Sequence, residues 1–174
     1  MNQRPLLLID VDGVLNPLAS KPPPGFGEHR LAGFLVRLSP QHGQWLLELE
    51  RDHNFELVWA TSWEHEANDL IGPVIGLPEL PVIELFNTQI SSGATWKLNA
   101  IRDYVGDRPF AWFDDDIGGD GYAWAKRRTR KLNIPTRFIE IPPLVGLRER
   151  DIEQARLFAA KVARWQANNP SNEQ

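Results

Sequence analysis

The sequence contains no cysteine, which excludes disulfide bonds, thiolate metal sites and a cysteine nucleophile. It also lacks an excess of positive charge. The formal net charge is −4, so the protein as a whole does not attract nucleic acids or anionic membrane surfaces. No apolar run approaches the length of a membrane span, and the N-terminal run meets Asp10 too early for a signal peptide. We therefore expect a cytoplasmic protein with no membrane association and no obligate protein partner.

What is present has the composition of a folded domain. Hydrophobic residues make up 42% of the 174 residues and charged residues 24%, which is ordinary globular composition and not that of a disordered chain. This length fits one compact unit and leaves little room for a second. We expect a single domain over residues 1–168, followed by a polar tail at residues 169–174.

Apolar runs alternate with helix-like segments along the chain. The runs "PLLLID", "NFELVWATS", "PFAWFDD" and "TRFIEI" are typical of strands, the first of them buried on both faces. They lie at residues 5–10, 54–62, 109–115 and 136–141. Helices are predicted at residues 39–52, 62–72, 95–106, 120–133 and 148–169. Such alternation predicts an α/β fold with a mainly parallel sheet.

The segment at residues 17–40 interrupts this alternation. Its first part, "NPLASKPPPGFGEH", is rich in proline and glycine, and its second part, "RLAGFLVRLS", alternates only loosely. We interpret the segment as a loop and a short hairpin that project over the strand ends, and thus as a functional flap. The alternative is a plain connection between two elements.

Polar side chains stand where three predicted strands end. Asp10 and Asp12 follow the first strand, Thr61 and Ser62 end the second, and the acids at 114–116 follow the third. Parallel α/β sheets place their ligands at the carboxyl ends of their strands, so these groups are expected to converge. Carboxylate oxygens suit Mg²⁺, and a magnesium ion together with Lys97 would relieve the repulsion between the aspartates.

The ordered motifs "LLLIDVDGV", "ELVWATS", Lys97 and "FAWFDDD" resemble those of the haloacid dehalogenase (HAD) superfamily over about residues 5–140. The stretches "WATSWEHEAN" and "WFDDD" also resemble the HAD-like domains related to those of multidomain RNA-repair proteins. The resemblance implies a Rossmann-like, three-layer α/β/α sandwich with a minimal cap.

The resemblance also implies a role for each matching residue. Asp10 would be the nucleophile that forms an aspartyl-phosphate, and Asp12 the general acid and then the base. Thr61, Ser62 and Lys97 would bind phosphate, with Lys97 also neutralising Asp10. Magnesium would be held by Asp10, the backbone carbonyl of Asp12, Asp114 and, as a helper, Asp115. Three consecutive acids leave open whether Asp115 or Asp116 takes the place of Asp114, which we prefer.

The implied function is a Mg²⁺-dependent phosphohydrolase that acts on a phosphomonoester. An open site with a short flap admits bulky substrates, including a nucleotide or a polynucleotide end. Two alternatives remain open at this point. One is a phosphotransferase with the same chemistry, and the other is a non-catalytic phosphate-binding or phospho-switch module. The acid at Asp12 argues against a stable switch and against dehalogenation.

The other conspicuous residues have simpler interpretations. The cations of residues 126–131 are read as a solvated helix face, opposite a side formed by Tyr122, Ala125, Thr129 and Leu132, with a nucleic-acid contact as the alternative. Trp59 and Trp112 are expected in the core. Trp63 follows the second motif and is expected to border the site, where it would be able to stack on a base or a ring.

Overall fold

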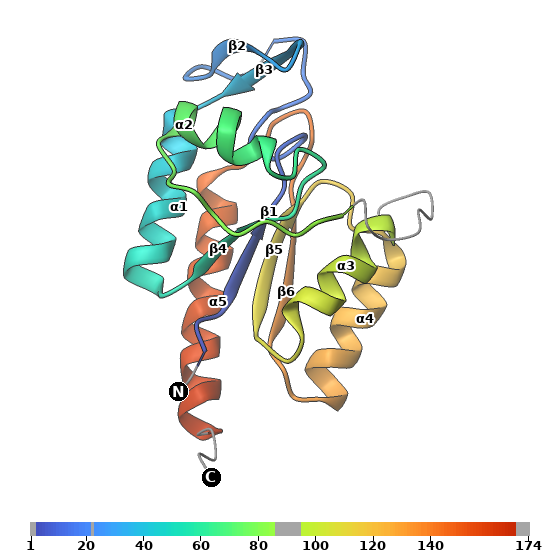
Figure 1. The fold of residues 1–174 in the computed structure, drawn as a ribbon. Helices are drawn as coiled ribbons and strands as arrows, with labels where there is room; N and C mark the ends of the chain where they lie inside the picture. The colour runs from blue at the N-terminus through green and yellow to red at the C-terminus, as the bar shows by residue number, and fades with distance from the viewer. Residues whose placement is uncertain (1–2, 22, 86–94, 170–174) are drawn as a thin grey trace.

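Four parallel strands form the central sheet of the protein in the computed structural model, which describes residues 3–21, 23–85 and 95–169 (Figure 1). The strand order is β4-β1-β5-β6, and every pair of neighbours runs parallel. All four predicted strands are confirmed, each somewhat shorter than its apolar run. Their bounds are Leu6–Ile9 for β1, Glu56–Trp59 for β4, Phe110–Asp114 for β5 and Thr136–Glu140 for β6.

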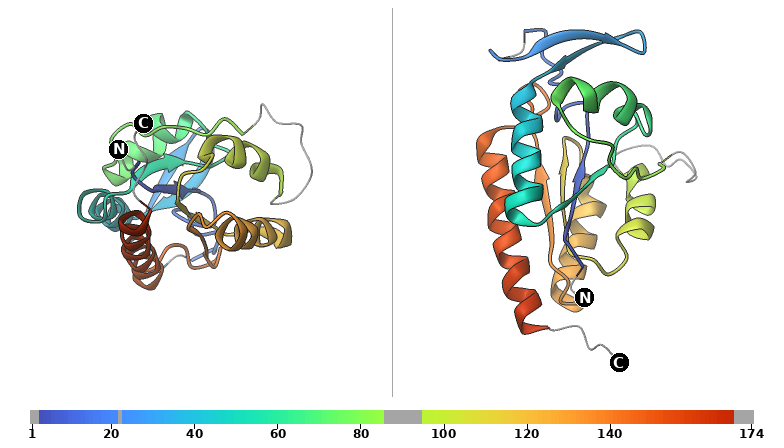
Figure 2. Two further views of the ribbon diagram at one scale, coloured as in Figure 1. Left: turned by 90° about the horizontal axis from the view of Figure 1, so that it is seen from below. Right: turned by 60° about the vertical axis from the view of Figure 1, so that its left-hand side comes forward.

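Alternate residues of each strand enter two separate cores, because successive side chains of a strand point to opposite faces of the sheet. Leu6 and Leu8 join the core on the side of α3 (Thr95–Val105) and α4 (Gly118–Lys131). Leu7 and Ile9 join the core on the side of α1 (Pro40–His53) and α5 (Glu149–Asn168). The helices therefore cover both faces, as Figures 1 and 2 show, and the three-layer α/β/α architecture is confirmed.

The predicted helix bounds agree with the structure within about two residues for α1, α3, α4 and α5. Ser39 stands at the N-cap of α1 with Pro40 following it, but its side chain makes no capping hydrogen bond. Within the described residues, no helix is both long enough and apolar enough to cross a membrane. The predicted polar tail lies outside the described residues from residue 170 onward.

The helix predicted at residues 62–72 is wrong in its form. Turns follow β4, and then come a π-helix at Ala67–Ile71 and a short helix α2 at Gly72–Ile75. Proline has no backbone N–H, so Pro73 cannot donate the regular helical hydrogen bond, and its ring crowds the carbonyl four residues earlier. The wider π turn, in which the Gly72 N–H bonds the carbonyl of Ala67, accommodates Pro73.

The prediction that the cations of residues 126–131 form a solvated face of α4 is wrong for Arg128, which is buried, whereas Tyr122 and Leu132 on the opposite side are exposed. The helix instead buries Gly121 and Arg128. The guanidinium of Arg128 donates hydrogen bonds to the carbonyls of Gly106 and Arg108 and lies over the ring of Phe110. One cation of the basic run is therefore a structural residue that joins α4 to the loop before β5.

The flap predicted at residues 17–40 contains an antiparallel hairpin, β2 (Gly27–Leu31) and β3 (Phe34–Leu38). It forms a sheet of its own and lies beyond the carboxyl ends of β1 and β5, at the top of Figure 1. The loop before it is tied to the hairpin at Asn16, whose Oδ1 accepts a hydrogen bond of 2.8 Å from the N–H of Arg37. The hairpin is thus anchored next to the turn that follows β1.

His42 is a buried titratable residue of α1. Its Nε2 lies 3.1 Å from the carbonyl oxygen of Leu147, in the loop before α5. Burial lowers the pKa of His42 from its ordinary 6.5 to about 4, outweighing the opposing effect of the backbone hydrogen bonds. The imidazole is therefore neutral in the folded protein at neutral pH and joins α1 to the loop before α5.

This histidine predicts a loss of stability in mild acid. Between pH 6.5 and 4 the unfolded chain binds a proton at His42 that the folded protein does not, so stability falls as the pH falls. At pH 5 the loss is about 2 kcal/mol. Urea unfolding of the native protein and of His42→Gln at pH 7.5 and 5 measures it. The variant should lose less stability than the native protein on acidification, and equal losses would contradict the assignment.

Candidate active site

The register of the sheet brings two aspartates from distant parts of the chain together. Ile9 of β1 pairs with Phe113 of β5, and each strand is followed or ended by an aspartate at this level. The N–H of Asp10 donates to the carbonyl of Phe113 over 3.1 Å, which fixes the backbone of Asp10 beside Asp114. Both side chains are almost completely buried. The predicted convergence of the first and third motifs is thus present in the structure.

Lys97 of α3 joins these two aspartates. Its Nζ donates to Oδ2 of Asp10 and, over 2.7 Å, to Oδ2 of Asp114. The ammonium is itself buried, so it cannot exchange these partners for water at low cost. A single side chain from the helix before β5 therefore fixes the relative position of the two carboxylates.

The charges of this centre do not balance. Burial on its own would lower the pKa of Lys97, but Asp10 and Asp114 outweigh it and raise that pKa above its ordinary value. Burial raises the pKa of Asp114 above its ordinary value, against the lowering effect of Lys97 and with a further raising effect from Asp10. The pKa of Asp115 is raised for the same first reason, with Asp10 next. Three carboxylates against one ammonium leave excess negative charge in a partly buried place.

The geometry of the acids fits a hard divalent cation. Asp10, Asp114 and Asp115 each offer a carboxylate oxygen, and these oxygens lie within 4.8 Å of one another. An all-oxygen donor set with excess negative charge is what Mg²⁺ prefers. Asp116 is not part of this cluster; its N–H donates to Oδ1 of Asp114 over 2.9 Å, and it is exposed. The arrangement favours Asp114 with Asp115 over Asp116.

A cleft of about 330 Å³ opens over this centre. The predicted site residues that line it are Asp10, Asp12, Ser62, Lys97, Asp114 and Asp115, together with Leu18, Trp96 and Asp116. Thr61 is buried, and its Oγ1 accepts a weak hydrogen bond of 3.4 Å from the N–H of Trp63. Thr61 thus orders the turn after β4, while Ser62 is exposed at the cleft.

Asp12 is held on both sides by residues that the sequence did not identify as its partners. Asn16 donates from Nδ2 to Oδ1 of Asp12 over 2.7 Å, and the indole Nε1 of Trp63 donates to Oδ2 over 2.9 Å. The expectation that Trp63 borders the site is confirmed. The sequence did not predict the contact between Asn16 and Asp12, because it depends on the turn that joins these residues. In this turn several N–H groups donate to the carbonyl of Val11.

The turn after Asp12 needs glycine at position 13, because the loop that carries Asp115 lies very close to it. The φ of Gly13 is +74°, which side-chain-bearing residues rarely adopt. A Cβ at this position would also lie 2.3 Å from Oδ2 of Asp115, closer than any real contact. Glycine after Asp12 therefore serves the conformation of the turn and also leaves the space that the Asp115 carboxylate occupies.

A Rossmann-like α/β/α fold with an Asp–Lys–Asp centre at the carboxyl ends of β1 and β5 is that of a haloacid dehalogenase (HAD) protein. A family described as the HAD domain in Swiss Army Knife RNA repair proteins matches residues 6–152, and the chain belongs to this family. The match confirms both resemblances seen in the sequence and indicates a phosphohydrolase-type function. A comparison with curated proteins found no match.

The acidic cluster predicts stabilisation by magnesium. Millimolar Mg²⁺ should raise the Tm of the protein by several degrees, because a ligand that binds only the folded state stabilises it. Asp114→Asn should remove most of this rise, since it deletes a charge at the centre. Asp116→Asn should keep the rise, because Asp116 lies outside the cluster. Thermal unfolding with and without Mg²⁺ tests this, and a larger effect at Asp116 than at Asp114 would contradict it.

Lys97 is expected to be important for stability when no divalent cation is added. Lys97→Met leaves two buried carboxylates without their partner, and breaking a buried ion pair from one side costs about 3–5 kcal/mol. Urea unfolding in the presence of a chelator measures the loss. The exposed Lys131, changed to Met, is the matched control and should change the stability little. Equal effects of the two substitutions would show that the Lys97 contacts are not stabilising.

Proposed function

We propose that the protein is a Mg²⁺-dependent phosphohydrolase that removes phosphate from a phosphomonoester through an aspartyl-phosphate on Asp10. The observation that carries the proposal is the Asp10–Lys97–Asp114 centre in a cleft that Asp12 also lines. The nucleophile and the candidate acid thus reach the same cavity, which is what in-line displacement on a phosphate needs. The phospho-switch alternative has no use for a second acid at this place.

The positions of the residues support a division of labour in two steps. In the first step an oxygen of Asp10 attacks phosphorus, the bond from phosphorus to the leaving oxygen breaks, and Asp12 gives that oxygen a proton. In the second step Asp12 takes a proton from water, the water oxygen bonds to phosphorus, and the bond to Asp10 breaks. Inorganic phosphate and a free Asp10 carboxylate result.

The surroundings of each aspartate fit these tasks. The N–H of Val11 donates to Oδ1 of Asp10 over 2.7 Å, and Lys97 holds Oδ2, so the nucleophile has a fixed orientation. Asn16 and Trp63 fix Asp12 in the same way. Each oxygen of a carboxylate offers two lone-pair positions, so Asp12 keeps capacity for a proton while both contacts persist. Magnesium held by Asp10, Asp114 and Asp115, together with the backbone carbonyl of Asp12, would offset the repulsion between the carboxylate and the phosphate.

The family description gives the class of substrate that we propose. Because the family is named for RNA repair proteins, we infer that the phosphate belongs to a nucleotide unit, either free or at the end of a polynucleotide. Residues 126–131 do not extend the site in this proposal, because Arg128 is a buried structural residue. The other cations of this run lie in the C-terminal half of α4, whereas the acidic loop precedes the N-terminal end of that helix.

The two aspartates should differ sharply when each is changed to asparagine. Asp10→Asn should abolish hydrolysis, because it removes the attacking oxygen. Asp12→Asn should slow kcat by about two to four orders of magnitude, the usual contribution of a general acid or base. The loss should be smaller for an aryl phosphate than for an alkyl phosphate, because an acidic leaving group needs less protonation. Steady-state hydrolysis of both substrates by both variants measures this.

A phosphate-binding module would behave differently in the same experiment. The two variants would then show similar, small losses with no dependence on the leaving group. Asp120→Asn is a useful control, because Asp120 is an exposed acid in the first turn of α4 that does not line the cleft. Its activity should match that of the native protein. If no phosphomonoester is hydrolysed with any divalent cation, the proposal is wrong.

A further inference from the structure

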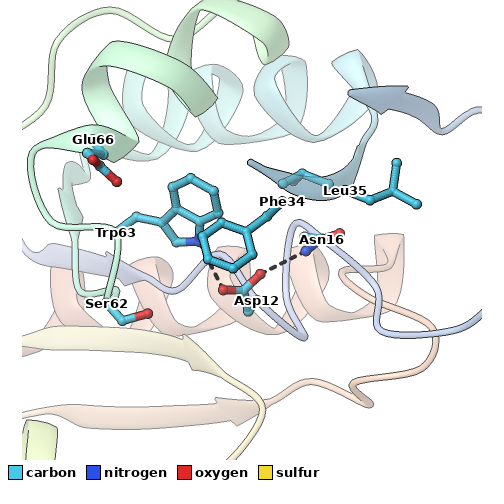
Figure 3. Close-up of a pocket in the computed structure, with 8 residues that line it drawn as sticks. Asp12, Asn16, Phe34, Leu35, Ser62, Trp63 and Glu66 are labelled. Carbon is cyan, nitrogen blue, oxygen red and sulfur yellow. Dashed lines mark hydrogen bonds between the residues drawn. The ribbon is translucent and has the colours of Figure 1, made fainter. Parts of the chain in front are cut away.

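A second pocket lies directly beside the acidic cleft and has a different character. It has a volume of about 340 Å³ and lies between the flap hairpin and the turn after β4 (Figure 3). Its lining includes Phe34, Leu35 and Val36 of β3 and Trp63 of the turn. None of the described residues that line it is cationic, whereas the neighbouring cleft contains Lys97. Apart from Asp12, none of the residues named for the two steps of the proposed reaction lines this pocket.

Asp12 and Ser62 line both cavities, so they mark the boundary between them. Asp10 lines only the acidic cleft, so under the proposed function the phosphorus atom lies there. The leaving oxygen must lie within hydrogen-bond reach of Asp12, on the side of phosphorus opposite the nucleophile. A leaving group that passes Asp12 from the acidic cleft enters the flap pocket. The pocket is therefore placed to hold the part of the substrate beyond the scissile bond.

The walls of the pocket select for a flat, uncharged group. Phe34 is 65% exposed, which is unusual for so large an apolar residue, and its ring lies edge-on to the indole of Trp63 with 6.1 Å between centroids. Figure 3 shows both rings beside Asp12, with the indole N–H bonded to its carboxylate. Exposed aromatic faces bind nucleobases by stacking. The carboxylates of Asp12 and Glu66 disfavour a leaving group that carries further phosphates in the pocket.

We propose that the flap pocket is the leaving-group subsite and takes the nucleoside that carries the scissile phosphate, with its base against Phe34 and Trp63. This inference rests on the proposed function for the position of the phosphate. The recognised unit is a nucleoside monophosphate, either free or at the end of an oligonucleotide. The flap thus sets the preference for nucleotides over phosphomonoesters that lack a base, and over nucleoside di- and triphosphates.

The hairpin holds Phe34 in place before any substrate arrives. Leu31 pairs with Phe34 across a two-residue turn, in which Ala32 and Gly33 have φ values of 47° and 84°. This is the tight turn that matches the twist of two antiparallel strands. Arg37, three residues on, bonds the Asn16 side chain through its backbone N–H. The same Asn16 orients Asp12, so the aromatic wall and the proposed acid share one support.

The test compares kcat/KM for adenosine 5′-monophosphate and ribose 5-phosphate, with Mg²⁺ present. The native protein should prefer the nucleotide, and Phe34→Ala should reduce this preference on the order of tenfold, the size expected for one base stacking on one ring. Phe34→Tyr should retain the preference because it keeps the ring. Phe34→Leu should lose it, although it remains apolar. Leu132→Ala, another exposed large side chain at the far end of α4, is the control and should leave the preference unchanged.

Two further arms give separate outcomes for the subsite and for the activity. Saturation-transfer NMR on Asp10→Asn measures binding of adenosine 5′-monophosphate without turnover, and the base protons should receive the strongest transfer unless Phe34 is changed to Ala. Adenylate oligomers with a 5′- or a 3′-phosphate distinguish a polynucleotide end from a free nucleotide. Hydrolysis with no preference for the base, unaffected at Phe34, would overturn the subsite and leave the phosphatase intact. Base contact at Phe34 without hydrolysis would overturn the phosphatase alone.

Discussion

The ammonium of Lys97 between two buried carboxylates is the interaction on which the rest of the site depends. The centre joins Asp10, which follows β1, to Lys97 of α3 and Asp114 at the end of β5, and each of the three is almost completely buried. Charges so poorly solvated are tolerated only when they are paired and hydrogen-bonded. The parallel pairing of β1 with β5 and the packing of α3 against them are therefore conditions for the centre to exist. The site is therefore present only when the sheet is folded.

The ion pairing at this centre leaves negative charge unneutralised, and this excess charge points to a chemical role for the site. One ammonium cannot neutralise Asp10, Asp114 and the neighbouring Asp115. Burial, and after it the charge of Asp10, raises the pKa values of Asp114 and Asp115. A structural ion pair would need no third carboxylate. An excess of negative charge beside a cleft of about 330 Å³ suits a divalent cation and, with the cation, an anionic substrate. The same residues thus serve stability and the proposed reaction.

The main features of the fold followed from the sequence, because periodicity and strand-end residues are local signals. Local patterns in the sequence predicted the four strands and four of the helices. The rule that ligands bind at the carboxyl ends of parallel strands then predicted that Asp10 and Asp114 converge near Lys97. Pro73 is a local cause of the wrong helix at residues 62–72, but two other features have non-local causes. Arg128 is buried because two carbonyls and a ring from other segments receive it. The partnership of Asp12 with Trp63 crosses 51 positions, which no spacing in the sequence encodes.

The flap hairpin has a strained turn and is anchored to the loop after β1. A rigid, anchored hairpin of this kind suits a surface that recognises a ligand. Ala32 is held at a φ of 47°, where a residue with a Cβ is strained by roughly 1–2 kcal/mol. A longer turn would relieve the strain but would remove Phe34 from its pairing with Leu31. It would also weaken the geometry by which Arg37 reaches Asn16. Because Asn16 in turn orients Asp12, the strained turn connects the exposed ring of Phe34 to the carboxylate that faces both cavities. The short hairpin therefore keeps the proposed recognition surface in register with the proposed acid.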